Sequence, residues 1–412
     1  MEKRELVIIG AGPAGLSAAI YGKRAGLDTL VLEKGRPGGQ VLITSKIENY
    51  PGILDGTGSG LADAFRTHAE HFKAEFRTAS VQKLEVRDGE KIITLKDGSE
   101  IAAGAVIVAS GASFRKQGCP GESTYTGMGV SYCAVCDAAF FEELEVAVIG
   151  GGNVAMDVCR TAIRLGAKDT YVIYRRSQAE MPADAEEVAE AMEEGVQFRF
   201  LSAPAEIIGE NGKVKALKVE IMELGEPDAK GRRKPVGTGK FETIEVTSVI
   251  GAIGQRVDLG HIAPEAMAFN RNGTVQADGV TYQTAQPDIF AGGDVVTGPK
   301  FAIDAIAAGR EGAISLHRYV HEGQSLTLAR DPREFFELDK KQAVVPIDCF
   351  DAPARQTVAH DASKAKTFSN DRITFTEAQV KAEASRCLGC GVSVVDQNKC
   401  IGCGLCTTRC EF

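Results

Sequence analysis

This chain of 412 residues has no excess of basic over acidic residues, few histidines and no long apolar run. The formal net charge of −9 leaves no basic field, which argues against binding to nucleic acid or to an anionic membrane. No apolar run reaches the roughly 20 residues that a membrane-spanning helix needs. The six histidines belong to no recognisable Ser/His/Asp set. We therefore expect a soluble cytoplasmic protein that binds neither nucleic acid nor a membrane.

Glycine and cysteine, in contrast, are abundant, with 46 and 11 residues. A disulfide scaffold would spread its cysteines along a short secreted chain, but here more than half of them lie after residue 386. Such clustering indicates metal or redox chemistry. The apolar and charged fractions of 44% and 25% are typical of a globular protein, and the length predicts two to three domains.

The N-terminal residues have the pattern of a β-α-β unit that binds a dinucleotide. We expect a buried strand at 6–9, a helix at 16–24 and a second strand at 27–32. The turn after the first strand contains Gly10, Gly12, Pro13, Ala14 and Gly15. Its glycines allow a pyrophosphate to approach the backbone, and the helix N-terminus supplies NH groups. Glu33, at the end of the second strand, can accept hydrogen bonds from a ribose.

A second unit of the same kind begins at residue 145. We expect a strand at 145–149, a helix at about 153–165 and a strand at 170–174. The turn residues of this unit are Gly150, Gly152, Asn153, Val154 and Ala155. Arg175 and Arg176 stand where the first unit has its acid. Two guanidinium groups can hold a 2′-phosphate, which an acid would repel, so this site is predicted to prefer NADP(H) and the first site FAD. The alternative is a solvated basic pair in a loop.

Two nucleotide units in one chain describe a flavoprotein that takes hydride from NADPH. Residues 1–320 resemble the two-dinucleotide-domain flavoprotein family of thioredoxin reductase and the glutamate synthase small subunit. The matching stretches are VIIGAGPAGLSAA (7–19), GGQ (38–40), ENYPG (48–52), VIVASGA (106–112) and AGGDV (291–295). The resemblance implies that further residues around the flavin are Gly39, Gln40, Asn49, Gly111, Gly254, Gly293 and Asp294.

The resemblance also implies the domain organisation. The fold would be α/β, with two Rossmann-like dinucleotide-binding domains and a small C-terminal iron–sulfur segment. The NADP(H) domain would be inserted into the FAD domain. The expected boundaries are 1–114 and 246–322 for the FAD domain, 115–245 for the NADP(H) domain, 323–375 for an extended arm and 376–412 for the iron–sulfur segment. Within the inserted domain, residues 225–240 are rich in glycine, proline and charge, which predicts a surface hairpin or loop without an assigned chemical role.

The chain resembles two branches of this family at once. Residues 131–137 are similar to the redox-active segment of thioredoxin reductase, which implies a dithiol of Cys133 and Cys136 with Asp137 as its acid–base partner. The stretches that instead resemble the glutamate synthase small subunit are 150–167, 174–183, 223–233 and 252–255. The two thiols are therefore an active dithiol, a vestigial pair or half of a metal site. The isolated cysteines, Cys119, Cys159 and Cys349, are expected to be structural thiols.

The C-terminal cysteines have the spacing of metal ligands. They are Cys387, Cys390, Cys400, Cys403, Cys406 and Cys410. The last four match the bacterial ferredoxin spacing for a [4Fe–4S] cluster, although Glu411 replaces the usual proline. Zinc is the alternative, but three thiolates in such close succession favour iron–sulfur. Six cysteines cannot complete two four-thiolate sites, so the choice of ligands stays open, and a second centre would need the Cys133 pair or a partner chain.

These parts predict an NADP(H)-dependent FAD and iron–sulfur oxidoreductase subunit within a hetero-oligomeric complex. It would pass electrons between NADPH, flavin and the cluster toward ferredoxin or a partner subunit. This arrangement resembles the NADPH-handling subunits of ferredoxin:NADP transhydrogenases, some of which bifurcate electrons. Two alternatives remain: a thioredoxin or disulfide reductase that uses Cys133 and Cys136, and a non-catalytic assembly module of a redox complex.

Overall fold

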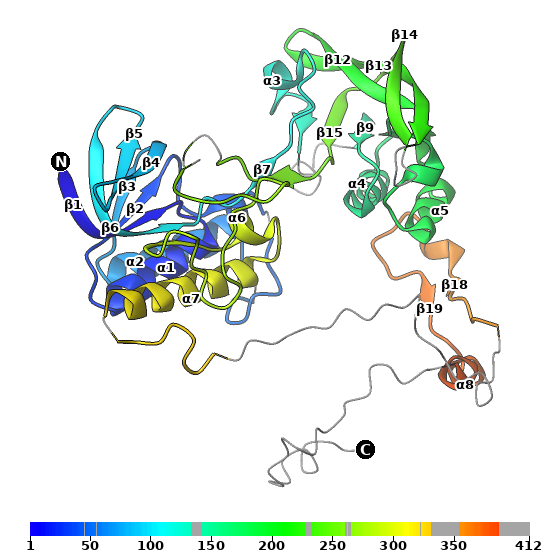
Figure 1. The fold of residues 1–412 in the computed structure, drawn as a ribbon. Helices are drawn as coiled ribbons and strands as arrows, with labels where there is room; N and C mark the ends of the chain where they lie inside the picture. The colour runs from blue at the N-terminus through cyan, green and yellow to red at the C-terminus, as the bar shows by residue number, and fades with distance from the viewer. Residues whose placement is uncertain are drawn as a thin grey trace. The chain divides into compact units, whose positions relative to one another are not determined.

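The computed structural model describes residues 1–44, 46–54, 56–132, 142–227, 233–259, 262, 265–321, 323–330 and 354–386. The chain forms two compact units, Met1–Arg333 and Glu334–Phe412. The first unit contains both predicted dinucleotide-binding domains, so the boundary between them stays a prediction. Figure 1 shows the elements of each unit.

The N-terminal part of the first unit is a sheet with strand order β3-β2-β1-β6-β5-β4, in which β17 also pairs with β6. The strands are β1 (Glu2–Ile9), β2 (Thr29–Glu33), β3 (Glu75–Thr78), β4 (Val81–Arg87), β5 (Glu90–Leu95), β6 (Glu100–Val108) and β17 (Ile289–Ala291). β1 is parallel to both β2 and β6, whereas β4 and β5 form an antiparallel hairpin. The helices of this part are α1 (Pro13–Arg24), α2 (Gly58–His71), α6 (Asp294–Thr297) and α7 (Ala302–Val320), with a 3-10 turn at Gly39–Ile43.

The central strand β1 is buried on both faces, as the apolar run at 6–9 predicts. Successive side chains of a strand point to opposite faces. Val7 therefore joins the core on one face of the sheet, and Leu6 joins the core that α1 and α7 cover on the other. α1 and α7 lie side by side under the sheet (Figure 1). The two helices contact each other so closely that only glycine fits at position 309. A Cβ atom there would lie 2.0 Å from the carbonyl oxygen of Ala14.

The second β-α-β unit forms a parallel sheet with the order β11-β10-β9-β15-β8. Its elements are β8 (Val130–Ser131), β9 (Glu145–Ile149), α4 (Asn153–Arg164), β10 (Asp169–Ile173), a 3-10 turn (Gln178–Glu180), α5 (Ala185–Glu193), β11 (Gln197–Arg199) and β15 (Ser248–Gly251). An antiparallel sheet accompanies it, made of β12 (Ser202–Glu210), β13 (Lys213–Pro227) and β14 (Arg233–Glu245). A short helix, α3 (Glu122–Tyr125), precedes β8. The predicted α/β fold with two Rossmann-like units is confirmed.

The chain crosses between the two sheets twice, and the crossings are paired. β7 (Ser113–Phe114) and β16 (Gln255–Arg256) form a short antiparallel ladder. The Phe114 ring stacks on Tyr132, with ring centroids 5.8 Å apart. The two crossings are thus joined by backbone hydrogen bonds rather than left as separate linkers.

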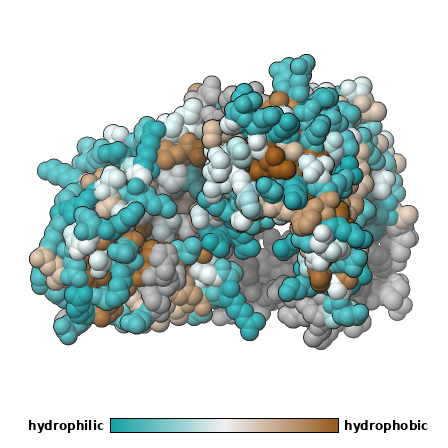
Figure 2. Space-filling model, turned by 90° about the horizontal axis from the view of Figure 1, so that it is seen from above, coloured by the Kyte–Doolittle hydropathy of each residue, from teal (hydrophilic) through white to brown (hydrophobic). Residues whose placement is uncertain are grey.

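The second unit has few described elements. They are the hairpin of β18 (Ala359–His360) and β19 (Arg372–Ile373), a 3-10 turn (Ala362–Lys364) and α8 (Glu377–Ser385). Thr376 and Gln379 form a capping box at the start of α8. Among the described helices, none is both long and apolar enough to cross a bilayer. On the face in Figure 2, hydrophilic residues predominate and hydrophobic ones form small separate patches.

Candidate functional site

The turn between β1 and α1 needs two of its glycines for packing and leaves the third open. Gly10 has a φ of +103°, and a Cβ atom there would lie 2.5 Å from the carbonyl oxygen of Ala109. A Cβ atom on Gly15 would lie 1.9 Å from the carbonyl oxygen of Gly10. Gly12 is different, because the nearest atom to its Cβ would be the Cα of Gly39 at 3.8 Å. The backbone at Gly12 is therefore open to a ligand, as a phosphate-binding turn requires.

This turn forms one wall of a cavity of about 470 Å³. Of the residues predicted to bind the first nucleotide, those lining the cavity are Gly10, Gly12, Pro13, Ala14, Glu33, Gly39, Gln40, Gly111 and Asp294. Gly15 lies behind them in α1, and Asn49, Gly254 and Gly293 do not line the cavity. Four segments distant in sequence thus meet at this cavity, and the cofactor contacts of all the predicted residues stay predictions.

A second cavity of about 280 Å³ continues the first. The residues common to both are Gly10, Glu33, Lys34, Ser110, Gly111 and Ala112. Its far end is formed by 79–81 and by Arg256, Leu259 and Ile262. Because the two cavities share these residues, they form one trough, and Gly10 of the glycine turn lines both parts of it. Such a trough suits an elongated dinucleotide. Lys34, Ser80 and Arg256 were missed from the sequence because no motif marks them.

Glu33, which lines both cavities of this trough, is held in place by two hydrogen bonds. One carboxylate oxygen accepts a hydrogen bond from the backbone NH of Ala11 at 2.8 Å, and the other accepts one from Gly35 at 3.1 Å. These bonds fix the carboxylate beside the glycine turn. Each oxygen keeps lone-pair capacity for a ribose hydroxyl.

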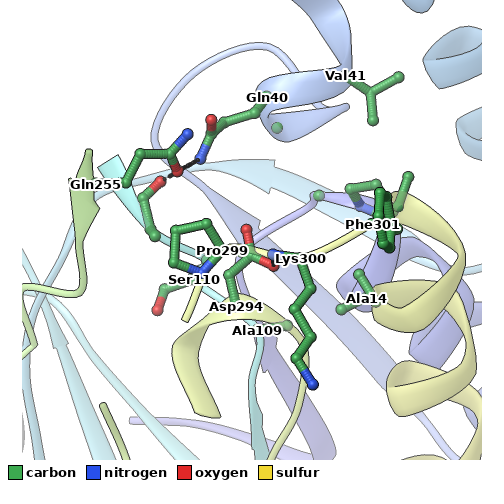
Figure 3. Close-up of a pocket in the computed structure, with 18 of the residues that line it drawn as sticks. Ala14, Gln40, Val41, Ala109, Ser110, Gln255, Asp294, Pro299, Lys300 and Phe301 are labelled. Carbon is green, nitrogen blue, oxygen red and sulfur yellow. Dashed lines mark hydrogen bonds between the residues drawn. The ribbon is translucent and has the colours of Figure 1, made fainter. Parts of the chain in front are cut away.

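Polar groups also fix the other end of the first cavity (Figure 3). The side-chain amide of Gln40 donates to the carbonyl of Ala112 and to the side-chain oxygen of Gln255, both at 2.7 Å. Gln255 belongs to β16, so a chain crossing contributes directly to the cavity. Burial raises the pKa of Asp294, and one of its oxygens accepts a hydrogen bond from the NH of Lys300 at 3.3 Å. Gln255 was not predicted as a site residue, although its stretch was noted as a resemblance.

The turn of the second unit has the same design. Gly150 has a φ of +152°, and a Cβ atom there would lie 2.4 Å from the carbonyl oxygen of Ala252. A Cβ atom on Gly152 would meet nothing within 4 Å. Ala155 is fully buried where the first unit has its third glycine, whereas the Val154 side chain is 63% exposed. The predicted strand, turn and helix are thus in register, with an open backbone position at the helix start.

The two arginines follow β10, as predicted. Arg175 is exposed, and Arg176 is half-buried. The Nε atom of Arg176 is shielded from solvent and has no hydrogen-bond partner among the described residues. An unpaired buried donor is costly unless a ligand satisfies it. These residues therefore fit an anionic group, and Asn153, hydrogen-bonded to Asp184 on both sides of its amide, braces the turn beside them.

Of the predicted cysteine sites, the structure describes only Cys119 and Cys159. Cys133, Cys136 and Asp137 lie outside the described residues, as do Cys349 and all six C-terminal cysteines. Cys159 is fully buried, and burial raises its pKa to about 12. Cys119 is half-buried, and burial also raises its pKa. A thiol that does not ionise at neutral pH is inert, so the described pair suits a structural role.

Comparisons with known proteins identify relatives of most of the chain. A family model described as pyridine nucleotide-disulphide oxidoreductase matches residues 4–309. The thioredoxin reductase of Bacillus subtilis (strain 168) is 36% identical over 328 residues, covering 78% of this chain and 96% of that protein. The crystal structure of Lactococcus lactis thioredoxin reductase in its FR conformation is 31% identical with a TM-score of 0.61, covering 77% of this chain and 99% of that one.

One further relative extends beyond this region. The NADP(+)-dependent formate dehydrogenase subunit beta of Moorella thermoacetica is 34% identical over 403 residues. The match covers 94% of this chain but 54% of that protein, so this chain spans about half the length of that relative. Residues after 322 make up over a fifth of the chain, and a match of this extent therefore reaches into them.

Proposed function

The chain belongs to the pyridine nucleotide-disulphide oxidoreductase family, and we propose that it is an NADP(H)-dependent FAD and iron–sulfur subunit of a larger redox complex. Family membership makes it a flavoprotein oxidoreductase and supports FAD and NADP(H) as its cofactors. In the proposal, electrons pass between NADPH, flavin and a [4Fe–4S] cluster toward ferredoxin or a partner subunit. The observation that carries the nucleotide part is the presence of two open glycine turns, one followed by an acid and the other by two arginines.

The trough of the first unit would hold FAD. The open backbone at Gly12 allows a pyrophosphate to approach, and the fixed carboxylate of Glu33 accepts hydrogen bonds from a ribose. Asp294 and Gln40 present polar groups at the other end of the cavity. Bound FAD would supply the conversion between two-electron uptake from NADPH and one-electron release.

The second unit would bind NADP(H) through its 2′-phosphate. Arg175 and Arg176 offer two guanidinium groups, one with an unpaired Nε atom, where an acid would exclude the phosphate. A half-buried guanidinium has few competing water contacts, so it favours the dianionic phosphate over a neutral hydroxyl.

The cluster and the complex rest on the C-terminal region. The spacing of its last four cysteines supports a [4Fe–4S] centre. The relative whose match reaches past residue 322 is itself called a subunit of an NADP(+)-dependent formate dehydrogenase. A similar place in a multi-subunit enzyme, with a partner that delivers or accepts electrons, is therefore proposed here.

Purification of the full chain under anaerobic conditions tests the proposal directly. We expect flavin, iron and acid-labile sulfide to co-purify, together with partner chains when it is isolated from its source. NADPH should bleach the flavin band, whereas the assembly-module alternative predicts no bleaching. Zinc in place of iron would contradict the cluster assignment.

A cysteine substitution separates the cluster from the flavin. We expect Cys403→Ser to lose iron and sulfide and to reduce a viologen dye at least about tenfold more slowly, since one thiolate ligand is missing. Bleaching of the flavin by NADPH should persist, because the nucleotide sites are intact. Cys119→Ser, which changes a half-buried thiol of the first unit, is the matched control. Equal loss in both variants would contradict the proposed exit through the cluster.

A thioredoxin or disulfide reductase is the second candidate, favoured by the identity of 36% to a thioredoxin reductase over most of its length. Replacing Cys133 and Cys136 by serine distinguishes the two. Under our proposal the double variant keeps viologen reduction within about twofold of the wild type, because the dithiol is not on the path. Thioredoxin reduction followed with a disulfide dye should be absent from the wild type. If it is present and disappears in the variant, the second candidate is correct.

A further inference from the structure

The hairpin of β13 and β14, to which the sequence assigned no chemical role, contributes a charged group to the loop of the two arginines. Arg233, the first residue of β14, donates hydrogen bonds from Nε and Nη2 to one carboxylate oxygen of Glu180, at 3.0 and 2.8 Å. Glu180 ends the 3-10 turn that follows Arg175 and Arg176. A residue some 50 positions away in sequence is thus fastened to the segment that carries the predicted phosphate ligands.

Glu180 is itself a fixed part of that segment. Its second carboxylate oxygen accepts hydrogen bonds from the backbone NH of Ser177, at 3.1 Å, and from the Ser177 hydroxyl. The bond from the Ser177 NH is one half of a capping box, in which the Ser177 side chain in turn accepts from the backbone NH of Glu180. Its carbonyl oxygen accepts a hydrogen bond from the Tyr174 hydroxyl at 2.7 Å. Two contacts therefore hold the carboxylate of Glu180, and a third holds its backbone, within the short loop after β10.

The carboxylate is ionised and belongs to the same short loop as the two arginines. The hydrogen bond from Ser177, and then that from Arg233, lowers the pKa of Glu180. Burial chiefly raises the pKa of Tyr174, and the charges of Arg176, Arg175 and Glu180 all act on the same hydroxyl. A lone anion at this position would repel a 2′-phosphate and compete with it for the guanidinium groups.

We infer that Arg233 is a positioning residue that sets the preference for NADP(H), by neutralising Glu180 beside the phosphate-binding arginines. This inference rests on the proposed NADP(H) site and adds a residue to it. Arg233 acts through Glu180 on the electrostatic field and on the loop geometry. Because its guanidinium is 45% exposed and Glu180 is 16% exposed, the pair is screened only in part.

The alternative is that Arg233 is purely structural and only holds the hairpin of β13 and β14 to the loop after β10. Loss of a purely structural contact would change the KM values for NADPH and NADH alike, because the two nucleotides differ only in the 2′-phosphate. A charge-neutralising role affects NADPH alone, and its loss is repaired when the carboxylate is also removed. The two roles therefore predict different outcomes in a double-mutant cycle.

The test uses the full flavin-loaded chain and steady-state reduction of a viologen dye with each nucleotide. Arg233→Ala should raise the KM for NADPH about tenfold and that for NADH less than about twofold, since a charge-assisted pair is broken beside one ligand only. Adding Glu180→Gln to Arg233→Ala should return the NADPH value to within about threefold of the wild type, because glutamine still accepts the Ser177 bonds of the capping box. Arg233→Lys should restore part of the preference.

Lys215→Ala is the matched control, since it breaks an exposed ion pair with Glu210 at 2.7 Å in the same antiparallel sheet. It should leave both KM values unchanged. Equal effects of Arg233→Ala on the two nucleotides, or no repair in the double variant, would overturn the inference. Failure of the proposed function looks different: the wild type would then not distinguish NADPH from NADH, and Arg176→Ala would change neither KM value.

Discussion

Gly15→Ala should abolish flavin binding and unfold the N-terminal sheet at lower temperature. The added Cβ atom would lie 1.9 Å from the carbonyl oxygen of Gly10 and 2.9 Å from its carbonyl carbon, and both are backbone atoms that no side-chain rotation can move. Helix α1 would have to shift away from β1, although both are packed in a fully buried core. We expect the free energy of unfolding to fall by about 3 kcal/mol or more. Thermal denaturation of the apoprotein measures this loss.

Alanine substitutions at two other glycines separate the effect on stability from the effect on FAD binding. Gly12→Ala adds a Cβ atom that meets only the Cα of Gly39 at 3.8 Å, so the apoprotein should keep its melting temperature. The new methyl group enters the open backbone position, and FAD affinity should still fall at least about tenfold. Gly279→Ala, in an exposed loop with nothing within 4 Å, should change neither quantity. If Gly15→Ala bound flavin normally, the proposed role of this turn would be wrong.

The local parts of the dinucleotide units were predictable from the sequence. Strand β1, the glycine turn and the acid at position 33 follow from short-range patterns in which each residue type has one steric or electrostatic reason to be there. The helix predicted at 16–24 begins instead at Pro13, because proline suits the first position of a helix and Gly12 caps it in an extended conformation. The error is one of boundary and not of element type.

The remaining site residues were not predictable, because tertiary folding brings them together. Ser80 and Arg256 reach the trough from a loop after β3 and from a chain crossing, and neither lies in a local motif. Arg233, at the start of β14, contacts Glu180 in the loop after β10. The antiparallel pairing of β14 with β13 sets the position of Arg233. Ion pairs of this kind depend on sheet register, which a glycine pattern does not encode.

Replacing Arg175 and Arg176 together by alanine should remove the preference for NADP(H). We expect kcat/KM for NADPH to fall about a hundredfold and that for NADH to change less than about threefold, because two charge-assisted hydrogen bonds to a 2′-phosphate are lost. Arg175 contributes the smaller part of this effect, since it is exposed and water weakens the contribution of an exposed guanidinium. Lys168→Ala, which breaks an exposed pair with Glu145 in the same unit, is the matched control and should behave as the wild type.

Salt provides a second readout of the same charges. Rising ionic strength should raise the KM of the wild type for NADPH more steeply than that for NADH, because screening acts on the additional phosphate charge. In the double variant the two slopes should coincide, since the cations that met this charge are gone. A variant that is merely misfolded would lose activity with both nucleotides and keep no such pattern. Parallel slopes in the wild type would instead mean that the arginine pair is a solvated surface feature and that the nucleotide preference arises elsewhere.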